Sequence, residues 1–301
     1  MRRNPLLLLL ALTFLSAGLP VHAQDDAALQ QRLADKLKLS DPALKPRKTS
    51  SPAGEAVSKP AVARTGKATK TMPKPSSWDY AGDGSPQHWA ELAPENKTCG
   101  VGTRQSPIDI RDTIKVDLEK INFDYHSSGF AVLDNGKTVQ VNMASGNTLQ
   151  VMGRSFELQE FHFHRPSEER VNGRQYEMVM HLTHRDADGK LAVVALLIER
   201  GPDNKPQAAV QQVWNNLPLE RAAPQMASGQ IDPMQLLPTD RSYFTYMGST
   251  TTPPCAEDVL WMVMKHPVQL TSAQIAIFAR LYPMNARPLQ SGSGRMIKES
   301  N

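Results

Sequence analysis

Strand-length runs of alternating hydrophobic and polar residues dominate the chain from about Ser77 onward. A period of two is typical of β-strands with one buried face, and Gly, Asn, Asp or Pro bounds most of these runs. The Asp134-Asn135-Gly136 turn and similar short connections favour hairpins, and therefore an antiparallel sheet. The segments with this texture are 130–143, 147–153, 156–165, 176–185 and the fully apolar 191–199.

Helical patterns are few in this part of the chain. They cover 205–217, around Pro206, and 272–282, directly behind Thr271. We find no internal repeat. The expected fold is therefore mainly β with peripheral helices, built on a single large twisted sheet that is mostly antiparallel.

The N-terminus begins with a different pattern. Residues 1–23 place two arginines before a short apolar run and end on Val21-His22-Ala23, which predicts a signal peptide and a mature chain that starts at Gln24. The mature protein is then expected to be periplasmic or secreted. A retained N-terminal anchor is the alternative.

Four further segments complete the expected organisation. Residues 24–40 carry leucines at every fourth position and predict a short amphipathic helix. Residues 41–76 are rich in Pro, Ala, Ser, Thr and Lys, with little to bury, and predict a disordered linker. A folded domain over 77–290 and a flexible tail over 291–301 are expected to follow.

Positive charge is concentrated in the predicted linker. The whole chain of 301 residues carries a formal net charge of +4, whereas 41–76 holds eight basic and two acidic residues. A solubilising spacer fits this composition, and weak contact with anionic envelope surfaces is the alternative. The basic residues lack interleaved aromatics, so no nucleic-acid partner is expected. No later part of the chain has 18 consecutive apolar residues, so no transmembrane segment is expected in the mature protein.

The sequence contains two cysteines, Cys99 and Cys255. An even pair in an exported chain is typical of one disulfide bond, because the extracytoplasmic space is oxidising. Two unrelated buried thiols are the alternative.

Histidines gather on two of the predicted strands. In 156–165 the period of two points His162 and His164, with Glu160, to one face, and a short loop allows 176–185 to fold back beside it with His181 on the same face. Three neutral imidazoles with a fourth position open suit a catalytic Zn²⁺ ion. The alternative is an ordinary pair of strands that carries unconnected histidines.

Ten short motifs occur in an order that resembles the α-class carbonic anhydrases, over residues 77–288. They are WDYAG at 78, HW at 88, QSPIDI at 105, NG at 135, EFHFHRPSE at 160, HLTH at 181, LAVVALL at 191, YFTYMGSTTTPPC at 243, Trp261 and NARP at 285. The resemblance implies the family's fold, with a metal at the bottom of a cone-shaped cleft. It also implies reversible hydration of CO2 to bicarbonate and a proton by attack of zinc-bound hydroxide.

The resemblance assigns roles to individual residues. His162, His164 and His181 match the zinc ligands. Thr251 matches the residue that accepts a hydrogen bond from zinc-bound hydroxide, and Glu168 matches the carboxylate that accepts that threonine's own proton. Residues that match the border of the CO2 pocket are Thr252, Val193, Val259 and Trp261, and Cys99 and Cys255 match a disulfide common in exported members.

Two departures from the family pattern affect the site. Lys137 stands where many members have a proton-relaying histidine, and its reference pKa of about 10.4 suits that task poorly. Another group or a water chain is the alternative route for the proton.

The second departure concerns the partner of His181. The family usually has a glutamate two residues before this ligand, where this chain has Val179, and a histidine where this chain has Glu169. We expect Glu169 to take over as the carboxylate partner of His181, with a water serving the imidazole as the alternative. Glu160 stands where a glutamine often contacts the first ligand, and it can accept the same N–H.

The main functional hypothesis is therefore a zinc-dependent carbonic anhydrase that takes CO2 or bicarbonate as its small-molecule substrate. A catalytically weak, carbonic-anhydrase-like binding protein of the cell envelope is the second. A zinc esterase is the third, although no ester pocket or Ser-His-Asp arrangement is visible. The presence of all three histidines, Glu168 and Thr251 favours the carbonic anhydrase hypothesis. Both a monomer and a dimer remain open.

Overall fold

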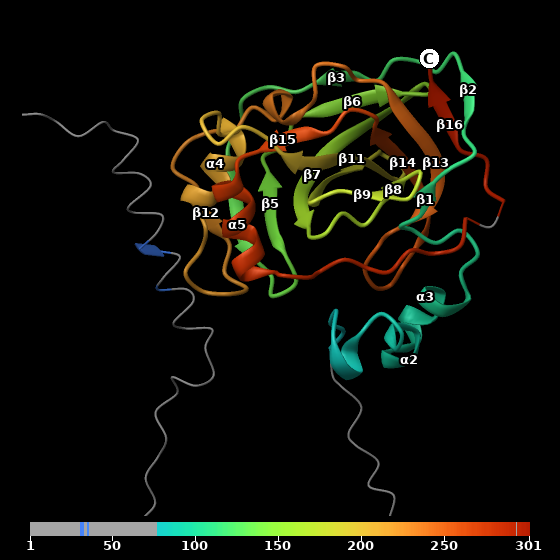
Figure 1. The fold of residues 1–301 in the computed structure, drawn as a ribbon, viewed down its shortest axis with the longest axis horizontal. Helices are drawn as coiled ribbons and strands as arrows, with labels where there is room; N and C mark the ends of the chain where they lie inside the picture. Colours follow the sequence, from blue (N-terminus) through green and yellow to red (C-terminus); the bar gives the residue numbers. More distant parts are fainter. Residues whose placement is uncertain (1–30, 33–34, 36–76, 293) are drawn as a thin grey trace, which may run out of the picture.

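The computed structural model describes residues 31–32, 35, 77–292 and 294–301 (Figure 1). The predicted signal peptide and linker lie outside these residues, as does most of the predicted amphipathic helix. Gln31, Arg32 and Asp35 are described and are helical. Within the described residues, no helix combines the length and apolar character needed to cross a bilayer.

A 13-stranded sheet forms the body of the described domain, and a three-stranded sheet adds to it (Figure 1). The central path of the large sheet runs in the order β12-β4-β5-β7-β10-β11-β14-β13-β16-β2, with β15 beside β11, and β6 joining β3 to β7. Its strands are β2 (Ile114–Val116), β3 (Asn122–Asp124), β4 (Phe130–Asp134), β5 (Val139–Met143), β6 (Thr148–Val151), β7 (Arg154–His164), β10 (Met178–Arg185), β11 (Leu191–Arg200), β12 (Gln225–Met226), β13 (Tyr243–Ser249), β14 (Glu257–Met264), β15 (Val268–Leu270) and β16 (Lys298–Ser300). The small sheet contains β1 (Asp109–Ile110), β8 (Arg170–Val171) and β9 (Arg174–Gln175).

The large sheet is mostly antiparallel, as predicted. Its parallel neighbours are β11 with β14, β11 with β15, and β16 with β2. The last of these corrects one expectation, because 291–301 was predicted to be a flexible tail. β16 (Lys298–Ser300) instead pairs with both β13 and β2, so the end of this segment is part of the sheet.

The helices are short and lie outside the sheet, as expected. The two predicted from sequence are α4 (Ala208–Asn215) and α5 (Ser272–Leu281), and Thr271 forms a capping box with Gln274 at the start of α5. Those not predicted are α2 (Trp89–Leu92), α3 (Thr98–Val101) and the 3₁₀ turns Gly82–Gly84, Pro94–Lys97 and Pro233–Leu236.

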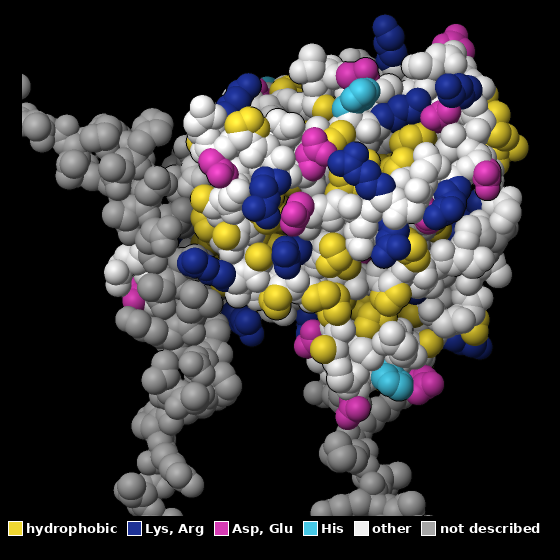
Figure 2. All heavy atoms as spheres, in the orientation of Figure 1, with side chains coloured by type: hydrophobic (Ala, Val, Ile, Leu, Met, Phe, Trp, Pro, Cys, Tyr) yellow, Lys and Arg dark blue, Asp and Glu magenta, His cyan; other side chains and the backbone are white. Residues whose placement is uncertain are grey.

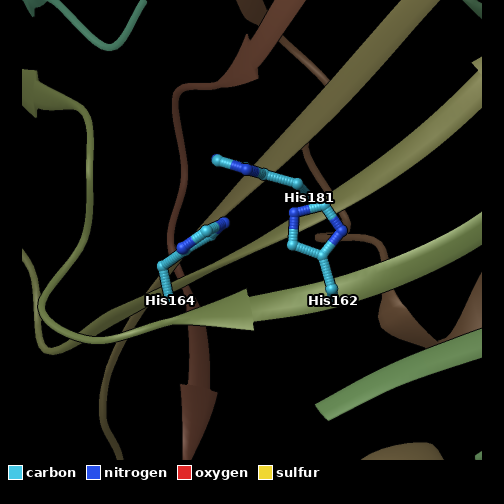
Figure 3. A group of neighbouring side chains, drawn as sticks. All are labelled: His162, His164 and His181. Carbon is cyan, nitrogen blue, oxygen red and sulfur yellow. The ribbon is translucent and has the colours of Figure 1, made fainter. Parts of the chain in front are cut away.

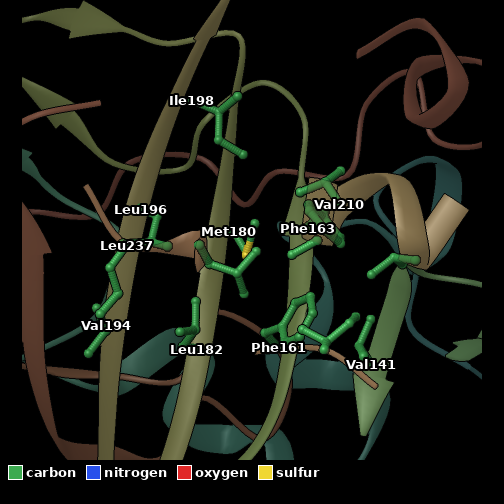
Figure 4. Packing of buried hydrophobic residues seen from close by; sticks show 14 of the residues in the cluster. Val141, Phe161, Phe163, Met180, Leu182, Val194, Leu196, Ile198, Val210 and Leu237 are labelled. Carbon is green, nitrogen blue, oxygen red and sulfur yellow. The ribbon is translucent and has the colours of Figure 1, made fainter. Parts of the chain in front are cut away.

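Hydrophobic cores lie on both faces of the sheet, and β11 contributes to both. Val194, Leu196 and Ile198 belong to the larger core, which α4 and α5 cover (Figure 4). Val193 and Leu197 belong to the smaller core on the opposite face. Burial on both faces accounts for the uninterrupted apolar run that the sequence shows here.

Strand β7 changes faces part-way along its length. Phe156 and Leu158 pack in the larger core, yet so do Phe161 and Phe163, which have the opposite parity. The pairing of β7 with β10 skips Gln159, so the alternation restarts after that residue. This irregularity lets the first half of β7 bury even-numbered residues while the second half points even-numbered residues away from the core.

Candidate metal centre

Three histidines from two adjacent strands point toward one another (Figure 3). His162 and His164 come from the end of β7, and His181 comes from β10, where it is the direct cross-strand partner of His162. One ring nitrogen from each histidine lies within 4.8 Å of the others. The His164 and His181 side chains are buried, whereas that of His162 is 19% exposed, so solvent reaches the group from the His162 side.

Each imidazole is held by a hydrogen-bond acceptor on its other nitrogen. His162 Nδ1 lies 2.9 Å from Glu160 Oε2, and His164 Nδ1 lies 2.7 Å from the backbone carbonyl oxygen of Asn285. A carbonyl and an ionised carboxylate accept only, so these nitrogens carry the protons and the Nε2 atoms keep their lone pairs.

The third histidine is held through Nε2 instead of Nδ1. His181 Nε2 lies 3.2 Å from Glu169 Oε2, which leaves Nδ1 as the nitrogen with the lone pair. Glu169 is fully buried rather than exposed. The expected contact between Glu169 and His181 is therefore present, while Val179 packs in the smaller apolar core.

These residues fit a bound metal ion. His164 Nε2 is buried and has no hydrogen-bond partner in the described part of the chain. A buried nitrogen lone pair without a partner is costly, and a cation shared with the other two imidazoles would satisfy it. A set of three nitrogen ligands suits zinc, as the sequence pattern indicated.

Behind the histidines lies a buried carboxylate. Glu168 Oε1 accepts a hydrogen bond of 2.7 Å from the backbone N–H of Arg287, and Oε2 lies 3.5 Å from His164 Nε2 and 3.8 Å from His181 Nδ1. Thr251 is also buried and its side chain hydrogen-bonds to Glu168. The structure thus brings Glu168 and Thr251 together beside the histidines.

Burial and neighbouring charges shift the pKa values in this group. Burial raises the pKa of Glu168 well above its usual value, with a further rise from the charge of Glu169, while Thr251 and Arg287 oppose it. Burial also lowers the pKa of His164 well below its usual value, assisted by His181 and His162. A cation at the centre would act on the carboxylate in the opposite direction, because positive charge favours the ionised form.

His162 behaves differently from His164. Burial alone would lower the pKa of His162, but the charge and hydrogen bond of Glu160, together with the charge of Glu169, outweigh this and raise it. Glu160 therefore orients the ring and also increases its basicity.

An apolar wall adjoins His181. Val193, Val259 and Trp261 all belong to the smaller core, and the Trp261 and His181 rings lie nearly perpendicular with centroids 5.0 Å apart. Trp261 Nε1 donates a hydrogen bond to the carbonyl of Ser249, which fixes the indole. Thr252, which is half-buried, follows Thr251 directly.

Lys137 lies in the turn between β4 and β5. Its ammonium group is 3.0 Å from Asp79 Oδ2 and 5.2 Å from the centre of the Trp78 ring. The side chain is therefore fastened to the first described residues of the domain.

Sequence reasoning missed the roles of Asn285 and Arg287, although it noted the NARP motif that contains them. The Asn285 carbonyl orients His164, and its side chain donates to the carbonyls of Lys137 and Phe163. The Arg287 guanidinium is buried and donates to the carbonyl of Ser106, while its backbone N–H holds Glu168. No local pattern gives these contacts, because they join segments that are more than a hundred residues apart.

Comparison with known proteins identifies the relatives of this arrangement. The family described as "Eukaryotic-type carbonic anhydrase" matches residues 84–301. The chain belongs to this carbonic anhydrase family. A carbonic anhydrase of Nostoc sp. is 39% identical over 233 residues, which cover 75% of this chain and 87% of that protein. One from Klebsiella pneumoniae is 40% identical over 227 residues, covering 74% and 91%.

Solved carbonic anhydrase structures share the fold. A hyperthermostable carbonic anhydrase from an active hydrothermal vent chimney has a TM-score of 0.72 and 39% identity, and the match covers 74% of this chain and all of that one. Dioscorin, solved in complex with ascorbate, has a TM-score of 0.67 and 30% identity, and the match covers 74% and 97%. The resemblance to α-class carbonic anhydrases and the expected fold are therefore confirmed.

Proposed function

We propose that the protein catalyses the reversible hydration of CO2 to bicarbonate and a proton, with a Zn²⁺ ion held by His162, His164 and His181. Membership of the carbonic anhydrase family supports the reaction. The observation that carries the metal assignment is the convergence of three imidazole nitrogens, each with its other nitrogen bound to an acceptor. Such ligands are oriented and have one tautomer, which is what a tightly bound ion requires.

When bound, zinc makes a hydroxide nucleophile available from water near neutral pH, an effect for which carbonic anhydrase is itself the standard example. The Thr251 hydroxyl donates a hydrogen bond to the Glu168 carboxylate, so its oxygen has only lone pairs left to offer toward the reacting solvent molecule. This arrangement orients the nucleophile. Glu168 in turn is fixed by the backbone N–H of Arg287, which keeps the acceptor in place.

Val193, Val259 and Trp261 supply the apolar surface on which a small neutral substrate can wait beside the centre, and Thr252 borders the same space. CO2 has no net charge, so such a surface can hold it without a polar partner. Bicarbonate, being charged, is expected to leave readily for solvent.

We also propose that the mature protein works in the periplasm or outside the cell. The disulfide between Cys99 and Cys255 supports an oxidising compartment. The catalytic domain is then expected to lie C-terminal to a basic linker.

The decisive test combines metal analysis with a stopped-flow CO2 hydration assay. We expect about one zinc per chain, loss of activity after chelation and recovery on adding Zn²⁺. His181→Ala should lose both metal and activity, whereas His266→Ala, at an exposed position on the β14–β15 connection, should lose neither. A zinc-loaded protein without hydration activity would instead favour a binding protein of the same fold; dioscorin, which shares the fold, was solved in complex with ascorbate.

A further inference from the structure

The N-terminal segment contacts the domain through Arg32. Its guanidinium donates to the backbone carbonyl of Leu217 from Nη2 at 2.7 Å and to that of Asn215 from Nη1. Nη2 also lies 3.5 Å from the side-chain oxygen of Gln225. One side chain thus reaches three acceptors on two separate elements, the end of α4 and strand β12.

The end of α4 is suited to receive a cation. Asn215 is the last residue of this helix, and the final carbonyls of a helix have no partner within it. They also form the negative end of the helix dipole, which attracts Lys and Arg. The planar guanidinium offers several N–H donors in a fixed geometry, so it can serve more than one carbonyl at once, whereas a lysine ammonium acts as a point charge.

Exposed hydrophobic side chains border the same place. Leu219 is 46% exposed and Met226, next to Gln225, is 75% exposed. Figure 2 shows hydrophobic side chains at the surface on the side of the molecule where Figure 1 places α4 and β12. The sequence around Arg32 predicts an amphipathic helix with Leu29 and Leu33 on one face, which is the complementary chemistry.

We propose that the α4–β12 surface, formed by Asn215, Leu217, Leu219, Gln225 and Met226, is a docking site for the N-terminal segment of the same chain, with Arg32 as its anchor. The chain between Arg32 and Ser77 is then attached to the catalytic domain at both ends. The domain therefore does not move independently of the N-terminal segment. A linker as disordered as the composition of 41–76 predicts gives an effective concentration of about millimolar, so the chain's own segment outcompetes a second copy at micromolar protein. The proposal does not depend on the zinc chemistry.

Paramagnetic relaxation tests this docking in the mature chain that starts at Gln24. A spin label on Met226→Cys should cause loss of amide signal intensity for the residues around Arg32. A label on Met296→Cys should leave those signals unchanged. Met296 is 62% exposed and precedes β16 by two residues, and Figure 1 shows β16 on the side of the domain away from β12. Both labels are introduced without reductant, so that the native disulfide stays intact.

The variants assign the effect to Arg32. In the Met226→Cys background, Arg32→Ala should restore the lost intensity and Arg32→Lys should restore most of it, whereas Arg47→Ala, which removes the same charge from the predicted linker, should change nothing. Intensity loss that survives Arg32→Ala, or no loss at all, overturns the proposal. A mixed sample detects docking between molecules: one set of copies is isotope-enriched without the spin label, and the other carries the spin label without isotope enrichment. Intensity loss in that sample overturns the assignment to the same chain.

Discussion

At the scale of single residues, the carboxylate that holds His181 is the main departure from the family pattern. Glu169 lies twelve residues before the ligand in the sequence and contacts its Nε2 atom, while Val179 fills an apolar position. In this chain the carboxylate that contacts the His181 imidazole comes from the segment just before β8 and not from β10 itself. This supports the expectation drawn from the paired changes at the two positions.

Glu169→Gln should weaken zinc binding by about 10 to 100-fold, because the amide accepts a weaker hydrogen bond than the carboxylate and adds no basicity to the imidazole. Competition with a chromogenic chelator measures the affinity. Glu220→Gln, at an exposed position, is the matched control and should bind zinc as the wild type does. Equal affinities for the two variants would show that Glu169 does not support the metal.

Lys137 stands where a proton relay would be useful, and its side chain is instead bound to Asp79 and Trp78. We expect turnover to rise with buffer concentration, because buffer must carry protons that the lysine does not. Lys137→His should be faster than the wild type at low buffer, as measured by stopped flow. Lys137→Gln separates the two effects, since it removes the ammonium without adding an imidazole. Rates indifferent to buffer in all three proteins would refute the prediction.

At the scale of elements, β10 serves two purposes through its alternation. His181 faces the metal centre, and His184, three residues later, faces the larger core, where its ring stacks on Tyr125 and hydrogen-bonds to the tyrosine hydroxyl. His184 is fully buried, and burial lowers its pKa to about 4. One strand thus carries a candidate ligand on one face and a structural histidine on the other.

This second histidine predicts a loss of stability in acid. The unfolded chain binds a proton at His184 with a pKa near 6.5 and the folded protein only near 4, so protonation favours unfolding as the pH falls between these values. Lowering the pH from 7 to 5 should cost about 2 kcal/mol of unfolding free energy through this group.

Chemical denaturation of the wild type and of His184→Gln at both pH values measures the effect. The variant should show a smaller acid-induced loss, and its difference from the wild type isolates this residue from the other titrating groups. His266→Gln, at an exposed position, should retain the full loss. The same pH dependence in all three proteins would contradict the prediction.

At the scale of the whole molecule, the disulfide joins the first helices of the domain to the loop that carries Thr251. Cys99 is bonded to Cys255, which lies 156 positions later in the sequence. The carbonyl of Cys99 accepts from Arg287 and that of Cys255 accepts from Gln105. Two distant parts of the chain are thereby held against the segment that positions Glu168.

Replacing both cysteines by serine should lower the unfolding free energy by about 4 kcal/mol, because a bond that closes so long a loop restricts the unfolded chain strongly. Guanidinium denaturation gives the value. Treating the wild type with a reductant should reproduce the loss, and the double variant should then be insensitive to that reductant. A double variant as stable as the oxidised wild type would show that native contacts alone hold these segments.

The sequence by itself determined the local features of this protein. Alternation placed His162, His164 and His181 on one face because side-chain direction within a strand depends only on neighbouring residues. The antiparallel class, helices α4 and α5 and the pairing of the cysteines followed from similarly local or compositional signals, together with the family resemblance. The alternation does not extend across Gln159, which β7 skips, and this irregularity depends on the pairing with β10 and not on β7 alone.

Only the tertiary structure decided which distant groups meet the histidines. Asn285 and Arg287 reach the centre from beyond α5, and β16 joins the sheet through residues with no strong strand pattern. The physical reason is that such contacts are set by packing and by the need to satisfy buried polar groups. These requirements act between segments far apart in sequence, where no local pattern records them.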